Sequence, residues 1–224
     1  MGGMTTEPAA AVTRTQRMPP RDQRRAQLLD IASGVFADKG YHNAAMDEIA
    51  EAAGGVSKPV LYQHFPPGKL DLYLALVQRA CVELLQMVEN ALGSTHDNHD
   101  RVVAVVTGVF NFVEHNRDGF RFIFQSDLTG EPQVHDLLWQ VNNDMASSIG
   151  RVIAEDTGLS RDEAQLLGVS LVGVAQVSAR HWAAEARTEM TEQHAAELVA
   201  TLVWRGISGF PPRLEAEETP PPLP

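Results

Sequence analysis

The sequence has few of the features that mark secreted or membrane-spanning proteins. Cys81 is the one cysteine among 224 residues, so no disulfide can form within the chain and a reducing setting is expected. The most apolar stretches, Val102–Phe110 and Leu166–Val177, are shorter than the roughly 18 residues that a membrane span needs. No apolar run of signal-peptide type opens the chain. We therefore expect a cytoplasmic protein without membrane contacts, with Cys81 as a small core residue.

Motifs of catalytic and metal sites are also missing. The run Gly54–Lys58 lacks the Gly-x4-Gly-Lys spacing of a phosphate-binding loop, and no Gly-x-Ser-x-Gly context for a nucleophile exists. The run His96–Asp100 offers imidazoles and carboxylates, but it lacks the helical i, i+4 pairing or Cys-x-x-Cys spacing typical of zinc sites. We expect no enzymatic activity, no metal and no cofactor.

The charge is distributed unevenly along the chain. The net charge is −11, yet residues 1–75 hold eight Lys/Arg and eight Asp/Glu, while residues 76–224 hold ten and twenty-one. An acidic body is repelled by DNA, so only the first third is suited to contact nucleic acid. Arg14, Arg17, Arg21, Arg24 and Arg25 form a basic stripe, which is either a solvated tail or an arm that touches phosphates or a minor groove.

The apolar residues follow a helical period throughout, without strand alternation or internal repeats. Hydrophobic residues make up 44% of the chain, enough for a sizeable core. We expect an all-α protein with helices at Asp22–Lys39, Met46–Ala53, Ser57–Phe65, Lys69 to about Gly93, Asp100–Glu114, Arg117–Gln125, Pro132–Glu155, Arg161–Ala186 and Thr191–Ser208.

Four segments are expected along the chain. Residues 1–20 form a disordered basic arm, and residues 211–224, rich in Pro and Glu, form a disordered tail. Residues 21–66 form a three-helix domain, and residues 67–210 form a larger helical bundle.

The second and third short helices have the pattern of a helix-turn-helix. Gly40 ends the first helix, Gly54 and Gly55 stop the second, Ser57 caps the third and Pro59 occupies its first turn. A short helix joined to a bracing helix by a Gly-containing turn can enter the major groove of DNA. The third helix, Ser57–Phe65, is the predicted recognition helix.

The run GYHNAAMDEIAEAAGGVSKPVLYQHFPPGKLDLY, residues 40–73, closely resembles the tetracycline-repressor (TetR) family. That family's pattern has F-x-x-x-G-Y, then I-A-x-x-A-G-V-S, then L-Y-x-H-F with a following Lys, and Leu28–Tyr73 cover it here. The resemblance implies a ligand-responsive regulator that binds a palindromic operator in double-stranded DNA as a homodimer. Repression, with release by a small effector, is the family's usual mode.

The resemblance also implies the DNA contacts. Tyr62, Gln63 and His64 lie at the exposed end of the recognition helix, Ser57 and Lys58 open it, and Val60 meets a thymine methyl or packs. Leu61 and Phe65 hold the helix as core residues. Arg24 and Arg25 are added from the basic stripe, so the complete expected contact set is Ser57, Lys58, Val60, Tyr62, Gln63, His64, Lys69, Arg24 and Arg25.

Three departures from the family pattern bear on DNA binding. Two glycines precede Val-Ser where the family has one, the run FPPGK is one residue longer than the commoner form, and Ala44 and Ala45 stand where the family favours Thr. One extra loop residue costs well under 1 kcal/mol. The orientation of the recognition helix is more sensitive to loop length, because the helix must be placed accurately. The alternative is therefore an interaction protein that keeps the fold with impaired DNA binding.

The larger domain is expected to hold both an effector pocket and a dimer interface. A small, largely apolar effector is expected, a lipid-like or aromatic molecule with an acyl thioester as one form. The candidate pocket residues are Phe110, Phe122, Trp139, Asn142, Gln176 and Arg180, for which plain core packing is the alternative. The candidate dimer residues are Gly168, Gly173, Trp182, Leu198 and Leu202, for which an intrachain core is the alternative.

Overall fold

The computed structural model describes residues 20–184 and 189–207, and every element in this part of the chain is a helix, which confirms the all-α prediction. Arg14 and Arg17, the C-terminal tail and the last residues expected in two helices lie outside the described residues. The helices are α1 Arg21–Asn43, α2 Met46–Ala52, α3 Lys58–His64, α4 Lys69–Gly93, α5 Asn98–His115, α6 Arg117–Phe124, α7 Pro132–Asp156, α8 Arg161–Ala184 and α9 Glu192–Ile207.

Glycines end the first two helices as the sequence predicts. Gly40 has φ +72° and breaks the regular backbone of α1 three residues before its end. Gly54 and Gly55 both have positive φ, at +80° and +75°, and donate backbone hydrogen bonds to the Glu51 and Ala50 carbonyls. These two carbonyls are left without partners in the last turn of α2, so the additional glycine extends the cap of that helix.

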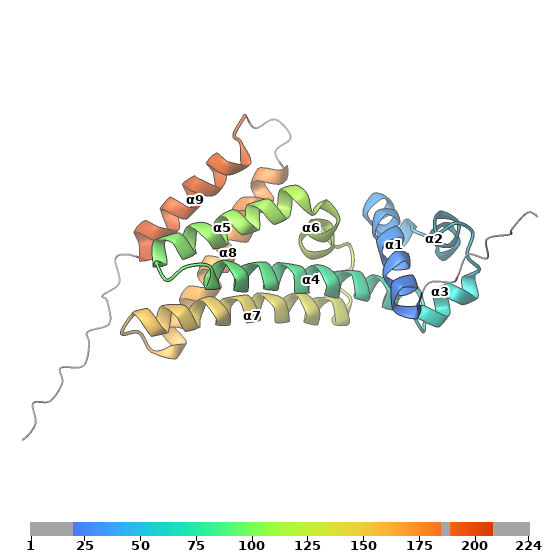
Figure 1. Cartoon of the computed structure of the whole chain (residues 1–224), viewed down its shortest axis with the longest axis horizontal. Helices are drawn as coiled ribbons and strands as arrows, with labels where there is room; N and C mark the ends of the chain where they lie inside the picture. Colours follow the sequence, from blue (N-terminus) through green and yellow to red (C-terminus); the bar gives the residue numbers. More distant parts are fainter. Residues whose placement is uncertain (1–19, 185–188, 208–224) are drawn as a thin grey trace, which may run out of the picture.

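Helices α1, α2 and α3 pack into a small unit at one end of the molecule (Figure 1). Leu28 and Phe36 of α1, Ile49 of α2 and Leu61 of α3 are all buried in its core, and Phe65 directly after α3 joins them. Burying these side chains positions α3 although its own seven residues are too few to form a stable isolated helix.

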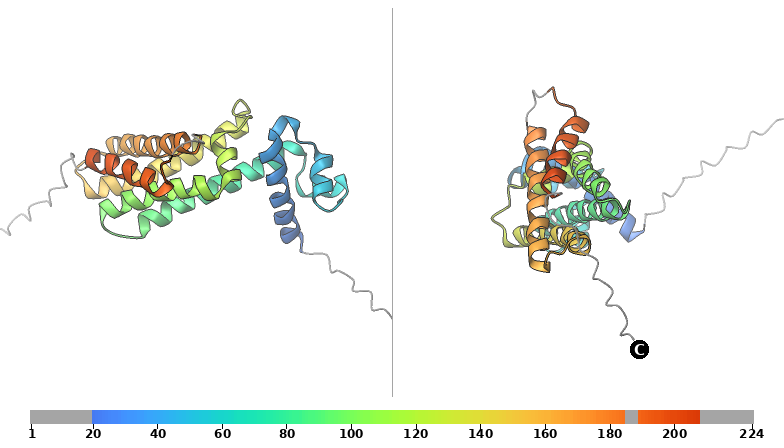
Figure 2. Two further views of the ribbon diagram at one scale, coloured as in Figure 1. Left: turned by 90° about the horizontal axis from the view of Figure 1, so that it is seen from above. Right: turned by 90° about the vertical axis from the view of Figure 1, so that its left-hand side faces the viewer.

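Helix α4 runs from this unit into the larger bundle, as Figure 1 and the left view of Figure 2 show. Within the bundle α7 and α8 pack most closely, because Gly168 of α8 lies against the Ala146 carbonyl of α7. Helix α9 lies beside α5. The two ends of α4 therefore belong to different parts of the molecule.

Helix α6 and the loop after it join the bundle to α1. The Ser33 hydroxyl donates to the Asp118 carboxylate at 2.8 Å, the Tyr41 amide donates to the Asp127 carboxylate at 2.8 Å, and Arg121 donates to the Ala37 carbonyl. These contacts link the small unit to the bundle at a second place besides α4. No helix in the described ranges is long and apolar enough to cross a membrane.

Candidate DNA-binding surface and effector cavity

The faces of α3 are divided as the sequence predicts. Leu61 and Phe65 are buried, whereas Ser57, Lys58, Tyr62 and Gln63 are exposed. Val60 and His64 are half-buried at the edges of the exposed face. The side chain of Ser57 makes no capping hydrogen bond, so only its position, and not its bonding, is that of an N-cap. Its hydroxyl thus has no role in starting the helix.

Two exposed side chains of α3 have partners in the neighbouring segments. The Lys58 Nζ lies 2.7 Å from the Asp47 carboxylate of α2, and both side chains remain largely exposed. The Tyr62 ring covers Gly68, where an added Cβ would approach the ring to 2.9 Å. The longer loop with Pro66 and Pro67 thus returns to the recognition helix and packs against it.

A basic cluster lies beside the end of α3. Arg21, Arg24 and Arg25 face His64, whose pKa is lowered from its ordinary value by burial and then by these three positive charges. The Arg25 guanidinium lies 4.7 Å from the centre of the Phe65 ring. The structure therefore brings together Arg24, Arg25 and His64, which the sequence analysis placed in the DNA-contacting set for separate reasons.

Lys69, the first residue of α4, lies at the same end of the molecule. Its Nζ is 4.4 Å from the centre of the Tyr41 ring and 3.5 Å from the His42 carbonyl oxygen. These contacts hold the ammonium beside the turn between α1 and α2. Such a restrained cation loses less side-chain entropy when it meets a phosphate.

A cavity of about 320 Å³ lies between helices of the bundle. Most of its walls are aliphatic, and its size falls in the range of small-molecule sites. It is lined by Val88, Leu92, Asn98, Arg101, Val102, Val105, Val106, Val109, Met145, Ile149, Val152, Ile153, Asp156, Thr157, Leu171, Val172, Ala175, Gln176, Val203 and Trp204.

Of the six predicted pocket residues, Gln176 lines this cavity and Asn142 reaches it indirectly. The Gln176 amide donates to the Asn142 side chain at 2.9 Å. Phe110 and Phe122 are buried core residues, whereas Trp139 and Arg180 are exposed. None of these four side chains lines this cavity, and the burial of Phe110 and Phe122 matches the alternative of plain core packing.

The valine-rich face of α5 lines the cavity, although none of its residues was predicted to do so. Val102, Val105, Val106 and Val109 all line the cavity, with the i, i+3, i+4, i+7 spacing of one helix face. That spacing was visible in the sequence, but a core face and a cavity face have the same pattern. Only the packing of the neighbouring helices separates them.

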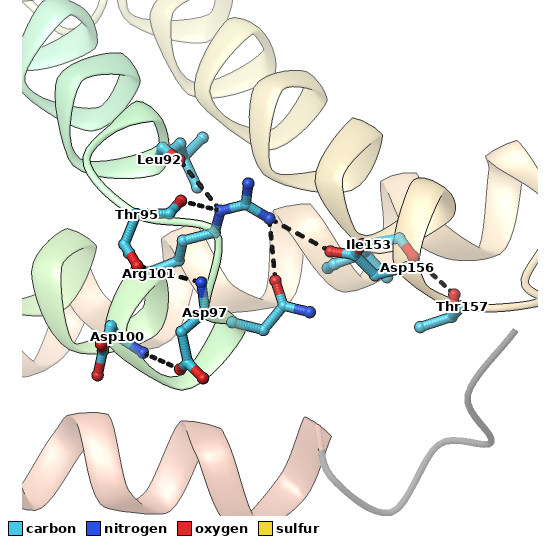
Figure 3. A network of polar contacts seen from close by, with 9 residues as sticks. Leu92, Thr95, Asp97, Asp100, Arg101, Ile153, Asp156 and Thr157 are labelled. Carbon is cyan, nitrogen blue, oxygen red and sulfur yellow. Dashed lines mark hydrogen bonds and ion pairs between the residues drawn. The ribbon is translucent and has the colours of Figure 1, made fainter.

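Four polar residues of the cavity lining, Asn98, Arg101, Asp156 and Thr157, come from the start of α5 and the C-terminal end of α7. Figure 3 shows the contacts around Arg101. Arg101 in the first turn of α5 meets Asn98 at 3.0 Å and Asp156 at the end of α7 at 3.3 Å. Its Nε also donates to the carbonyls of Leu92 and Thr95, at 3.1 and 2.9 Å. This single side chain joins the end of α4, the following loop and the end of α7.

The predicted dimer residues fall into two groups. Gly168 and Trp182 are used within the chain, since Gly168 meets the Ala146 carbonyl and the Trp182 indole donates to the Met190 carbonyl at 3.0 Å. Around Gly173 the space is open, and Leu198 and Leu202 are 49% and 67% exposed. Further exposed apolar side chains on α8 are Leu166, Val169 and Val177.

Comparisons with known proteins agree with this arrangement. The family model for bacterial regulatory proteins of the tetR family matches residues 28–76, and the model for the tetracyclin repressor-like C-terminal domain matches residues 98–206. The HTH-type transcriptional activator FasR of Mycolicibacterium smegmatis is 43% identical over 204 residues, 91% of each chain. The chain belongs to the TetR family. This TetR protein is therefore a transcriptional regulator, and not an enzyme.

Solved structures of other regulators share the fold of this TetR protein. A TetR-like regulator from Rhodococcus sp. RHA1 has a TM-score of 0.66 and 26% identity, and the match covers 86% of this chain and 100% of that one. FadR from Bacillus subtilis, in complex with stearoyl-CoA, has a TM-score of 0.66 and 17% identity over 80% of this chain and 96% of its own.

Proposed function

We propose that the chain is a cytoplasmic regulator that binds a palindromic operator as a homodimer and responds to an apolar effector. The observation that carries the proposal is the course of α4. One end of this helix holds Lys69 beside the recognition unit, and the other end contributes Val88 and Leu92 to the cavity wall. A ligand that shifts the cavity end of a stiff helix also shifts its DNA end.

The proposed DNA contacts are the exposed residues of α3 and the basic cluster. Lys58, Tyr62 and Gln63 are available to the major groove, and Arg24 and Arg25 to phosphates. The basic cluster beside the exposed face of α3 supports DNA binding over the alternative of a fold kept only for protein interaction.

The proposed effect on transcription is activation. The sequence favoured repression as the usual mode of the family, but a relative at 43% identity over nine-tenths of the chain is named an activator. A reporter gene placed under the DNA upstream of this protein's own gene tests the assignment. Deleting the regulator should lower expression of the reporter. A rise in expression would instead show that the protein is a repressor.

The proposed effector carries a long acyl chain. The cavity is aliphatic, and the structural neighbour FadR was solved with stearoyl-CoA. The aliphatic wall of this chain is the stronger support, since apolar surfaces are recognised by burial without directional bonds.

The proposed homodimer forms through the exposed apolar faces of α8 and α9. Leu166, Val169, Leu198 and Leu202 give these faces large side chains that water otherwise surrounds. Exposed apolar side chains of this kind are typical of protein interfaces. A two-fold dimer also places two recognition helices for the two half-sites of a palindrome.

Operator binding tests the proposal. Fluorescence anisotropy with the chain's own upstream DNA should show an affinity that falls steeply with salt. Lys58→Ala should weaken binding about tenfold and lower the salt slope by about 1, because one phosphate or base contact is lost. Arg79→Ala is the matched control, since it also removes one cation from an exposed ion pair, here with Asp30 at 2.6 Å. Binding that is absent or insensitive to salt would favour the interaction role.

A further inference from the structure

The cavity is elongated and has a polar end. Its lining residues on α7 extend from Met145 to Asp156, about 17 Å at the helical rise per residue. Asn98, Arg101, Asp156 and Thr157 cluster at the end farthest along α7, where α5 begins. Between them and Gln176 the walls are almost wholly aliphatic.

Two charged side chains at the polar end of the cavity reach solvent. The side chain of Asp156 is 38% exposed, and that of Arg101 is 17% exposed. An amphiphile entering here would slide its chain between the aliphatic walls and leave its head group beside Arg101. The opposite orientation would bury the head group among valines, at a high desolvation cost.

The Arg101 guanidinium is held in place without needing Asp156. Its Nε donates to the Leu92 and Thr95 carbonyls and its Nη1 to the Asn98 side chain, all within 3.1 Å. The Asp156 carboxylate is the most distant partner, at 3.3 Å (Figure 3). Among the described residues, Nη2 has no hydrogen bond. An orientated cation with a spare donor and one loosely held carboxylate is suited to exchange that carboxylate for another anion.

We infer that Arg101 binds the anionic oxygens of the effector's head group and that Asp156 is the internal carboxylate which the head group displaces. The inference rests on the proposed acyl effector and adds its charge, its orientation and the residue that selects it. The ligand class is an amphiphile with one long apolar chain and a carboxylate or phosphate at its end. Asp156 then acts as a competitor, so its charge weakens ligand binding.

A purely structural role of Arg101 makes a different prediction. Arg101 connects α4, α5 and α7, so a structural role means that breaking the Arg101–Asp156 pair from either side loosens the cavity and weakens every ligand. In the proposed role, removing the charge of Arg101 weakens ligand binding and removing the charge of Asp156 strengthens it. Only the affinity for charged ligands changes.

The test measures binding of dodecanoate, its methyl ester and dodecanoyl-CoA to the full chain by calorimetry. Arg101→Gln should weaken dodecanoate at least tenfold and leave the methyl ester within twofold. Asp156→Asn should tighten dodecanoate threefold or more. Asp100→Asn is the matched control for Asp156→Asn. It also removes one exposed carboxylate near Arg101, but Asp100 does not line the cavity, so the affinity for dodecanoate should stay unchanged.

Several outcomes would overturn the inference. Equal weakening of acid and ester in Arg101→Gln, or weaker dodecanoate binding in Asp156→Asn, would assign Arg101 a structural role while the acyl effector stands. Absence of binding by all three probes would overturn the acyl effector and the inference with it. Arg101-dependent binding of dodecanoyl-CoA alone would support the inference and identify the anion as a phosphate.

Discussion

Among single residues, His64 shows how one side chain on the recognition helix is tied to the core. Its Nδ1 is buried and has no hydrogen-bond partner among the described residues, and Arg21, Arg24 and Arg25 lie near it. Burial and these positive charges both disfavour the protonated ring, so the pKa of His64 is lowered. Folding therefore favours the neutral ring of His64.

The shift of His64 has a consequence for stability against pH. Because the folded pKa is below that of the unfolded chain, the unfolded state binds more protons as the pH falls, and stability decreases from about pH 7 towards pH 5. His64→Gln should make this decrease smaller, as measured by urea unfolding at pH 7.5 and 5.5. His135→Gln on the exposed face of α7 is the control and should keep the wild-type dependence. An unchanged pH dependence in His64→Gln would contradict the prediction.

At the scale of helices, the close contact of α7 and α8 depends on small residues. A Cβ on Gly168 would lie 2.2 Å from the Ala146 carbonyl oxygen, closer than real atoms approach, and that oxygen belongs to the backbone. A Cβ added to Gly150 of α7 would likewise lie 3.0 Å from the Ala164 carbonyl oxygen of α8. These two glycines therefore allow α7 and α8 to pack closely.

Gly168→Ala should therefore lower the free energy of unfolding by about 1–3 kcal/mol, because the helices must move apart. Gly34→Ala is the control, since Gly34 lies inside α1 with nothing within 4 Å of an added Cβ. There the higher helix propensity of alanine should raise stability by up to about 1 kcal/mol. Chemical denaturation of both variants measures these values. A stabilised Gly168→Ala protein would show that the close contact is not required.

For the molecule as a whole, five of the nine exposed large hydrophobic residues in the described ranges lie on α8 and α9. Leu166 and Leu202 are 66% and 67% exposed, which is the most of any large hydrophobic residue in the described ranges. Elsewhere, Trp139 on α7 is 63% exposed and Val82 on α4 is 54% exposed, each without such neighbours on its own helix. Burying the α8 and α9 faces in a second copy would remove this surface from water.

Leu202→Glu should convert the proposed dimer into a monomer, because a carboxylate would have to be desolvated at the centre of the interface. Analytical ultracentrifugation measures the change, and operator affinity should fall at least tenfold with it, since two half-sites are no longer read together. Val82→Glu adds the same charge to a different surface and should remain dimeric. A dimeric Leu202→Glu protein would place the interface elsewhere.

The sequence by itself determined the helical class, the ends of most helices and the family. These properties follow from local signals, such as the 3.6-residue period, the glycines at 40, 54 and 55, and the contiguous run of residues 40–73. The division of α3 into supporting Leu61 and Phe65 and exposed Lys58 and Tyr62 was predictable for the same reason.

The tertiary structure alone decided which apolar faces enclose a cavity and which meet water. Phe110 and Val109 are neighbours on α5 and equally apolar, yet only Val109 lines the cavity. The pairing of Arg101 with Asp156, 55 residues apart, likewise depends on where α5 and α7 meet. Periodicity shows that a helix has a face to bury, but the partner of that face is set by packing between distant segments, to which local patterns are insensitive.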